Sequence, residues 1–357
     1  MKRWRHCVGS ILLLAIVASS AIGAEFDLTR VDAAIAAQVS SGQFMGAVLI
    51  ARDKRVLLNK GYGKASLEWG MPNSSSTRFR LASTTKQFTA ASILLLQQEG
   101  KLMIEDPVSK FVPDAPAAWA QITIFNLLTH TSGIHEITAL PDFDASEPFP
   151  TTPEKLVARF RDLPLDFTPG TEFRYSNSGY ILLGYLIEKI TGEPYREYVQ
   201  KNLFNPLGMK DSGYDSNVEI IPRHAEGYAP KSNGFTVAGY VDMTIPFAAG
   251  GLYSTTADML RWEEGLFGGK VLHATAFARM KTPFKKDYAF GLVVDPDASG
   301  AAVIWHCGAI EGFASCIAYV PIEQLAVIVL SNVEGPGAHT LLKDILKIAG
   351  HEPLTPK

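Results

Sequence analysis

Three short patterns bring together side chains that can carry out nucleophilic acyl transfer. They are Ser83-Thr-Thr-Lys86, Tyr175-Ser-Asn177 and His306-Cys307-Gly308. A serine hydroxyl is a weak nucleophile and needs an adjacent base. Lys86 follows Ser83 by three residues, so a helix would place both side chains on one face. The alternative is a serine that caps a helix, with a solvated lysine.

The segment around Ser83 predicts a helix from Thr84 to Glu99 that ends at Gly100. Backbone N–H groups at a helix start favour developing negative charge on a reacting group. A lysine has an ordinary pKa of about 10.4 and is a base at neutral pH only if that pKa falls. The apolar continuation of the helix would bury the Lys86 stem and lower its pKa.

The second pattern is predicted to lie in a turn before a helix that runs from Tyr180 to Thr191. A tyrosinate-like Tyr175 oxygen would relay a proton to or from Ser83. The Asn177 amide has a donor and an acceptor, so it can hold a lysine and a substrate carbonyl together. The alternative is an Asn-Ser-Gly turn without chemistry.

The third pattern is predicted to end a strand. Gly308 would let a substrate backbone approach that strand closely. The next backbone N–H, that of Ala309, would form an oxyanion hole with the N–H of Ser83. His306 would hydrogen-bond the substrate, whereas His130 is predicted to be structural.

The chain has no His-Glu-x-x-His, Gly-x-Ser-x-Gly or Walker A pattern, so we expect neither a metal nor another cofactor.

These residues must be positioned by strands from both ends of the chain and helices from its middle. We predict a helix over 27–39, a hairpin over 46–59, strands at 288–294, 303–306, 314–320 and 326–330, and a last helix over 338–348. Asp106-Pro107 is expected to start a helix and 140–153 to form a surface loop. The expected fold is α+β: an antiparallel sheet flanked by helices, with an all-helical lobe. The sheet lobe would span about 25–80 and 245–357, and the helical lobe about 90–240, with a cleft between them.

The first 24 residues have the layout of a secretory signal peptide. Lys2, Arg3 and Arg5 precede the apolar run from Ile11 to Val17, and small residues follow. The alternative is an uncleaved anchor. We therefore expect a single catalytic domain over 25–357, exported to a bacterial periplasm or the extracellular space and not inserted in the membrane after signal removal. In an oxidising compartment Cys307 and Cys316 would form a disulfide or remain as two buried thiols.

Composition excludes two broad classes. Of the 357 residues, 47% are hydrophobic and the formal net charge is −3, so the chain is neither disordered nor a nucleic-acid binder. The expected partner is a small-molecule or peptide acyl substrate. The sequence leaves the oligomeric state open.

The chain resembles the serine β-lactamase-like superfamily, which comprises class C β-lactamases, penicillin-binding proteins, DD-peptidases and related esterases. The resemblance covers nearly all of the chain after residue 24. Its landmarks are Phe79-Arg-Leu-Ala-Ser-Thr-Thr-Lys86, Leu127-Leu-Thr-His-Thr-Ser-Gly133, Tyr175-Ser-Asn177, Pro206-Leu-Gly-Met209, Ala249-Gly-Gly-Leu-Tyr-Ser-Thr255 and Trp305-His-Cys-Gly308. The resemblance implies a β-lactamase/transpeptidase-like fold.

The resemblance also implies roles for individual residues. Ser83 would be acylated, Lys86 and Tyr175 would share base and acid roles, and Asn177 would orient the substrate. Where class C β-lactamases and most DD-peptidases usually have Lys-Thr-Gly, this chain has His306-Cys-Gly, which lacks a permanent charge for a substrate carboxylate. The expected function is therefore a serine hydrolase for an ester or amide (an esterase, D-peptidase or β-lactam substrate). The alternative is a penicillin- or peptidoglycan-binding protein that is acylated without significant turnover.

Overall fold

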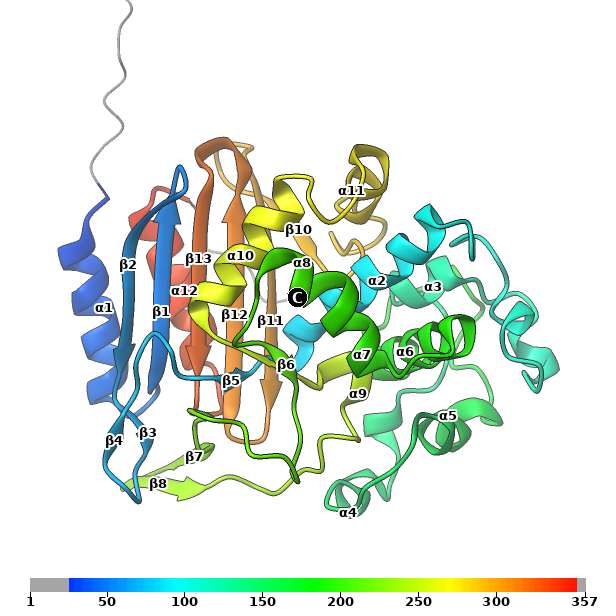
Figure 1. Cartoon of the computed structure of the whole chain (residues 1–357), viewed down its shortest axis with the longest axis horizontal. Helices are drawn as coiled ribbons and strands as arrows, with labels where there is room; N and C mark the ends of the chain where they lie inside the picture. Colours follow the sequence, from blue (N-terminus) through cyan, green and yellow to red (C-terminus); the bar gives the residue numbers. More distant parts are fainter. Residues whose placement is uncertain (1–25, 352–357) are drawn as a thin grey trace, which may run out of the picture.

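A six-stranded antiparallel sheet forms one side of the molecule. The computed structural model describes residues 26–351, so the predicted signal peptide at 1–24 lies outside the described residues. The strand order is β10-β11-β12-β13-β1-β2 (Figure 1). The strands are β1 (Gly46–Arg52), β2 (Arg55–Tyr62), β10 (Val293–Pro296), β11 (Ala302–Ile310), β12 (Phe313–Val320) and β13 (Leu325–Ser331).

The alternation of side chains along the strands gives this sheet two apolar faces. Val48 and Ile50 of β1 pack with α1 (Leu28–Ser40) and α12 (Gly337–Ile348) on one face. Ala47 and Leu49 point to the other face and join a larger core with the central helices. Every residue of β13 is buried, which fits its place inside the sheet between β12 and β1.

Helices cover the second face of the sheet and extend away from it (Figure 1). The α-helices are α2 (Lys86–Gln98), α3 (Ile124–Leu128), α4 (Phe143–Ser146), α5 (Pro153–Arg161), α6 (Asn177–Thr191), α7 (Tyr195–Val199), α8 (Asn205–Leu207), α9 (Phe247–Gly250), α10 (Thr256–Phe267) and α11 (Ala274–Met280). Single helical turns are η1 (Ala82–Thr85), η2 (Val108–Lys110), η3 (Ala117–Trp119), η4 (Ile137–Ala139) and η6 (Pro321–Glu323), and η5 (Gln200–Phe204) is a π-helical turn.

Short strands connect these two parts. A three-stranded sheet has the order β5-β9-β6, and two hairpins pair β3 with β4 and β7 with β8. Their bounds are β3 (Lys64–Ser66), β4 (Met71–Pro72), β5 (Phe79–Arg80), β6 (Gly213–Tyr214), β7 (Tyr228–Lys231), β8 (Gly234–Val237) and β9 (Leu252–Ser254). Since β5 leads directly into η1, this small sheet fixes where the Ser83 segment begins.

The structure corrects several predicted elements. The predicted strand 288–294 is mostly irregular, because a turn at Gly291 (φ +67°) separates Tyr288 from β10. The helix predicted at Asp106-Pro107 is only the single turn η2, which Pro107 precedes in extended conformation. The region 140–153 contains the short helix α4. No helix among residues 26–351 has both the length and the apolar character needed to cross a membrane.

Candidate active site

The Ser83 segment is a tight helical turn that leads into a buried helix. Ser83 lies in η1, and Lys86 is the first residue of α2. Ala82 has a φ of +47°, a left-handed conformation that is uncommon for a residue with a Cβ atom. Such conformations persist only where the surroundings hold them, and they cluster at functional sites. The predicted helix over Thr84–Glu99 is therefore confirmed in substance, with a 3-10 turn at its start.

Lys86 is completely buried and hydrogen-bonded in three directions. Its Nζ lies 3.0 Å from Ser83 Oγ, 2.8 Å from Asn177 Oδ1 and 2.9 Å from the carbonyl oxygen of Ala249. The same Nζ is 4.8 Å from the centre of the Tyr175 ring. Residues from η1, α6, α9 and the segment before α6 thus meet at the ammonium group of Lys86. The contacts with Ser83 and Asn177 were predicted from the sequence, and the contact with the Ala249 carbonyl was not.

Burial changes the acid–base character of this lysine. It lowers the pKa of Lys86 from 10.5 to about 7, because the charged form loses its hydration, while the negative charge of Glu136 acts in the opposite direction. A lysine with this pKa is largely neutral just above pH 7. Its lone pair is then available at hydrogen-bonding distance from the Ser83 hydroxyl.

Tyr175 presents a neutral hydroxyl to Ser83. Burial raises the pKa of Tyr175 well above 10, while its hydrogen bond with Ser83 lowers that pKa by a smaller amount. Its side chain is still 37% exposed along the cleft, so a substrate can reach it. The raised pKa favours the protonated form of Tyr175, whereas the tyrosinate-like oxygen predicted from the sequence would exist only while a proton is being passed. Tyr175 can donate and pass on a proton.

Asn177 is the first residue of α6 and does not lie in a turn as predicted. Ser176 caps the helix, its side chain accepting from the N–H of Gly179. Asn177 Nδ2 donates to Glu136 Oε1 at 2.9 Å, and Asn177 N donates to Glu136 Oε2 at 2.7 Å. Sequence reasoning missed Glu136. It is 41 residues from Asn177, and no spacing rule connects a loop carboxylate to a helix start so distant in the chain.

Gly308 lies inside β11, not at its end, and its role differs from the prediction. A Cβ atom at this position would lie 2.5 Å from Ser83 N and 2.5 Å from the Leu81 carbonyl oxygen. Because Gly308 has no side chain, β11 can approach the backbone of the Ser83 turn. The sequence had instead predicted that a substrate backbone would approach the strand at this glycine. The close approach places the backbone of the following residue, Ala309, beside Ser83.

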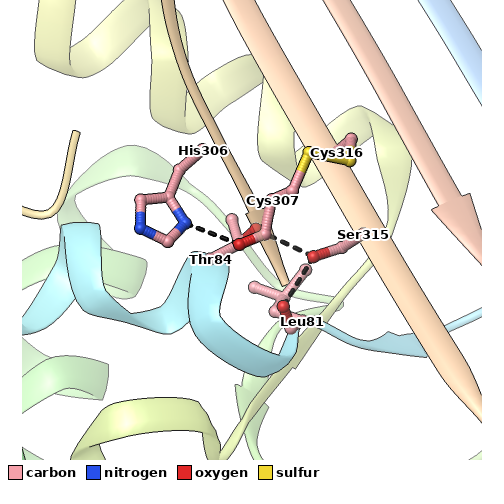
Figure 2. The surroundings of a disulfide bond; sticks show 6 residues. All are labelled: Leu81, Thr84, His306, Cys307, Ser315 and Cys316. Atoms are coloured by element: carbon pink, nitrogen blue, oxygen red, sulfur yellow. Dashed lines mark hydrogen bonds between the residues drawn. A yellow bond between two sulfur atoms is a disulfide. The ribbon is translucent and has the colours of Figure 1, made fainter. Parts of the chain in front are cut away.

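Hydrogen bonds fasten the Ser83 turn to the sheet. Ser315 Oγ of β12 donates to the Leu81 carbonyl oxygen at 2.6 Å and lies 2.8 Å from Thr84 Oγ1 (Figure 2). These contacts bracket Ser83 on both sides and hold η1 against β11 and β12. Ser83 and Ala309 thus lie on segments that pack together, and both border the same two cavities.

His306 is buried, and both of its ring nitrogens have partners within the protein. Nδ1 is 2.7 Å from the Cys307 carbonyl oxygen, and Nε2 is 3.1 Å from the Tyr288 hydroxyl (Figure 2 shows the first contact). Burial, helped by the charge of Lys86, lowers the pKa of His306 to about 3, so the ring is neutral. His306 therefore supports the wall of the site and does not offer a free donor to a substrate.

His130 has a structural position, in line with the prediction. Its ring is buried, and Nδ1 accepts a hydrogen bond from Ser176 N–H at 3.0 Å. The ring lies 4.3 Å from the Tyr175 ring, centre to centre. Burial lowers the pKa of His130 well below its usual 6.5. A neutral His130 therefore holds the segment that presents Tyr175.

Cys307 and Cys316 form a disulfide between directly opposed positions of β11 and β12 (Figure 2). This resolves the alternative that the sequence left open. The bond lies one residue from Gly308 and joins the two strands against which η1 packs. It adds a covalent link to the wall of the site.

Two cavities meet at Ser83 and Ala309. One has a volume of about 330 Å³ and is bounded by α4, α9 and the start of α6; its wall includes Asp144, Glu147 and Glu311. The other has a volume of about 450 Å³, and its wall includes Phe173, Tyr175, Trp305 and the disulfide. A substrate bond at Ser83 would thus have space on both sides. Among residues 26–351, no group of three or more His, Cys, Asp or Glu side chains is arranged to hold a metal ion.

Comparison with known proteins identifies the family of the chain. The model of the Beta-lactamase family matches residues 31–350, and the chain belongs to this family. It is 31% identical over 293 residues to "Putative penicillin-binding protein PbpX" of Bacillus subtilis (strain 168), covering 82% of this chain and 71% of that protein.

Solved structures show the same fold. A penicillin-binding protein from Bacillus halodurans superposes with a TM-score of 0.80 at 28% identity, covering 88% of this chain and 99% of that one. A D-stereospecific amidohydrolase from Streptomyces sp. gives a TM-score of 0.77 at 26% identity, covering 89% and 98%. The molecule therefore has the β-lactamase/transpeptidase-like fold, and its relatives are serine hydrolases and penicillin-binding proteins.

Proposed function

We propose that this protein is an exported serine hydrolase that cleaves an ester or amide through an acyl-enzyme at Ser83. One observation carries the proposal. Lys86 Nζ lies 3.0 Å from Ser83 Oγ, and burial lowers the pKa of this lysine to about 7. The pair thus has the geometry and the proton affinity of a base and a nucleophile at neutral pH.

Acylation follows from the positions of these groups. As Ser83 Oγ forms a bond to the substrate carbonyl carbon, its proton passes to the neutral Lys86 amine. The backbone N–H groups of Ser83 and Ala309 stabilise the negative charge that develops on the carbonyl oxygen. When the bond to the leaving group breaks, that group takes a proton from the Tyr175 hydroxyl, which Lys86 replenishes. Asn177 holds Lys86 in place throughout.

Deacylation reverses the proton path. A water molecule attacks the acyl carbon and loses its proton to the same Lys86–Tyr175 pair. The bond to Ser83 Oγ then breaks, the serine is reprotonated, and the free acid leaves. No metal or other cofactor is needed for any of these steps.

The charges at the site favour a substrate without a carboxylate next to the reacting carbonyl. Asp144, Glu147 and Glu311 border the cavity of about 330 Å³. Burial and these two neighbouring carboxylates raise the pKa of Glu147 to about 7. These carboxylates therefore disfavour a further negative charge in this cavity, and the neutral His306 supplies no positive charge to offset it. An uncharged ester or amide fits better than a penicillin.

The relatives support both this function and a second candidate. Likeness to a D-stereospecific amidohydrolase favours amide hydrolysis. Likeness to a putative penicillin-binding protein favours the alternative, a protein that is acylated at Ser83 but releases the acyl group negligibly. The disulfide supports export, because such bonds persist in oxidising compartments. We further propose that residues 25–357 act as one catalytic unit of two lobes.

Turnover and acylation can be measured separately. The protein is incubated with p-nitrophenyl butyrate, a D-alanyl peptide amide and a chromogenic cephalosporin, and product formation is followed alongside intact mass. We expect many turnovers with the ester or the amide and none with Ser83→Ala.

Two results would contradict the hydrolase. A stable mass adduct on Ser83 without turnover would establish the binding protein instead. Equal rates for the wild type and Ser83→Ala would exclude Ser83 as the nucleophile.

A further inference from the structure

The carboxylate of Glu136 accepts hydrogen bonds from the start of α6 and from Thr138 in the neighbouring turn η4. Its Oε1 accepts from Asn177 Nδ2 at 2.9 Å and from Thr138 Oγ1 at 3.0 Å. Its Oε2 accepts from the backbone N–H groups of Asn177 at 2.7 Å and Ser178 at 3.4 Å. Both oxygens are thus used, and the helix start is a favourable place for a negative charge.

These contacts decide which way the Asn177 amide points. An asparagine side chain has one donor end and one acceptor end, and only its surroundings choose between the two orientations. Glu136 takes the donor end, so Oδ1 faces Lys86 Nζ at 2.8 Å. With the amide reversed, its NH₂ group would face the lysine and could not accept from it.

The groups around Lys86 show why this matters. Its ammonium has no carboxylate in direct contact, since all three hydrogen-bond partners are uncharged oxygens. Glu136 acts one residue further out, and its charge raises the pKa of Lys86 against the effect of burial. The other titratable side chains that face this lysine are Tyr175, Tyr180, His130 and His306.

We propose that Glu136 is a positioning residue for acylation, acting through Asn177 to hold the Lys86 amine against Ser83 and through its charge to set the protonation of that amine. This inference rests on the proposed function, because it assigns a role at the same site. Glu136 is absent from the walls of both cavities that meet at Ser83. Because Glu136 itself does not line either cavity, we expect it to affect the rate of acylation more than substrate affinity.

The test compares Glu136→Gln and Glu136→Asp with the wild type. Glutamine has the size of glutamate, but one of its two polar ends is an NH₂ group. That NH₂ group would face a hydrogen-bond donor of Asn177 or Thr138, so at least one of the present hydrogen bonds would be lost. We expect kcat to fall roughly 10–100-fold, as misplaced catalytic groups do, with KM little changed. The acid limb of the pH profile should move to lower pH in Glu136→Gln and stay in place in Glu136→Asp. Glu172→Gln, which removes an exposed charge 3.9 Å from Arg174, is the matched control.

Several outcomes would overturn the proposal. Wild-type kcat in Glu136→Gln would do so, as would an equal loss at every pH with the acid limb unmoved, which is the result expected for a purely structural role. If Glu136→Gln is not folded by circular dichroism, Glu136→Asp must still lower kcat without moving the acid limb, or the proposal fails.

Failure of the proposed function would look different. The wild type would then show neither turnover nor labelling of Ser83 by a fluorophosphonate. In that case the protonation of the Lys86 amine can still be followed by NMR, from the ¹³C chemical shift of Lys86 Cε as a function of pH. The midpoint of this titration must lie at lower pH in Glu136→Gln than in the wild type, and an unchanged midpoint would refute the role of Glu136.

Discussion

Lys86 is the side chain on which the proposed chemistry of the site depends. The three-residue spacing from Ser83 predicted its contact with the serine, because residues three apart on a helix lie on one face. The sequence also predicted a lowered pKa from the apolar helix that follows. The sequence did not reveal Glu136, whose contact with Asn177 arises only when the loop after α3 packs against the start of α6.

Activity should depend on the deprotonated form of Lys86. Its pKa is lowered to about 7, so the neutral amine, the form that accepts the serine proton, predominates only above this pH. We expect kcat/KM for an ester to rise as the pH increases through about 7. Lys86→Ala should lower kcat/KM roughly 10²–10⁴-fold and remove this limb. A profile without a limb between pH 5 and 9, or near-native activity in Lys86→Ala, would refute the role of Lys86 as base.

Burial of His306 should make the protein sensitive to acid. Its pKa is about 3 in the folded protein, against 6.5 ordinarily. As the pH falls below 6.5, the unfolded chain binds a proton that the folded protein does not bind. The free energy of unfolding therefore decreases, by at most about 1.4 kcal/mol per pH unit for this group, until about pH 3.

Urea unfolding at several pH values between 7 and 4 checks this expectation. His306→Asn should flatten the dependence, whereas the exposed His273→Asn should leave it as in the wild type. Identical slopes in all three proteins would show that His306 does not contribute.

At the scale of elements, the close contact between η1 and β11 places Ser83 against the six-stranded sheet. Gly308 permits this contact because it has no side chain. The sequence predicted that a substrate backbone would approach Gly308, whereas in the structure the backbone of the Ser83 turn does, and the His-Cys-Gly pattern does not indicate which of the two it would be. Helix ends were easier to predict. Asp27 caps α1, and Gly192, in left-handed conformation, ends α6, as local residue types indicate.

Gly308→Ala should separate the strand from the Ser83 turn. The new Cβ atom would lie 2.5 Å from Ser83 N, so the backbone must shift. We expect a loss of about 1–3 kcal/mol in the free energy of unfolding and a larger relative loss of kcat, since the oxyanion donors move apart. Gly239→Ala is the control, because its Cβ would meet only Glu311 Cγ, at 3.5 Å. Equal kcat in both variants would contradict this account.

The disulfide should stabilise the same pair of strands. The double variant Cys307→Ser/Cys316→Ser removes a cross-link with a sequence separation of 9. For a short loop of this kind we expect a loss of about 2–3 kcal/mol in the free energy of unfolding, measured in urea. Dithiothreitol should destabilise the wild type similarly and leave the double variant unchanged. An equal response of both proteins to the reductant would show that the bond does not form in solution.

At the scale of the whole molecule, sequence reasoning predicted the class of fold better than its details. Short β-rich runs near both ends and helical segments between them indicated a sheet assembled from distant parts of the chain. The strand 288–294 was predicted from its apolar residues, yet these pack as an irregular segment against α2, where a Cβ on Gly291 would lie 2.6 Å from the Lys86 carbonyl oxygen. Tertiary packing overrides local preference there.

The position of β1 also affects how the molecule can be made. This strand, from residues 46–52, is hydrogen-bonded on one side to β2 and on the other to β13, from residues 325–331. A ribosome therefore releases β1 long before its second neighbour exists. Pairings so distant in sequence are slow to form. The nascent chain must therefore remain without its finished sheet at least until residues 325–331 have been synthesised.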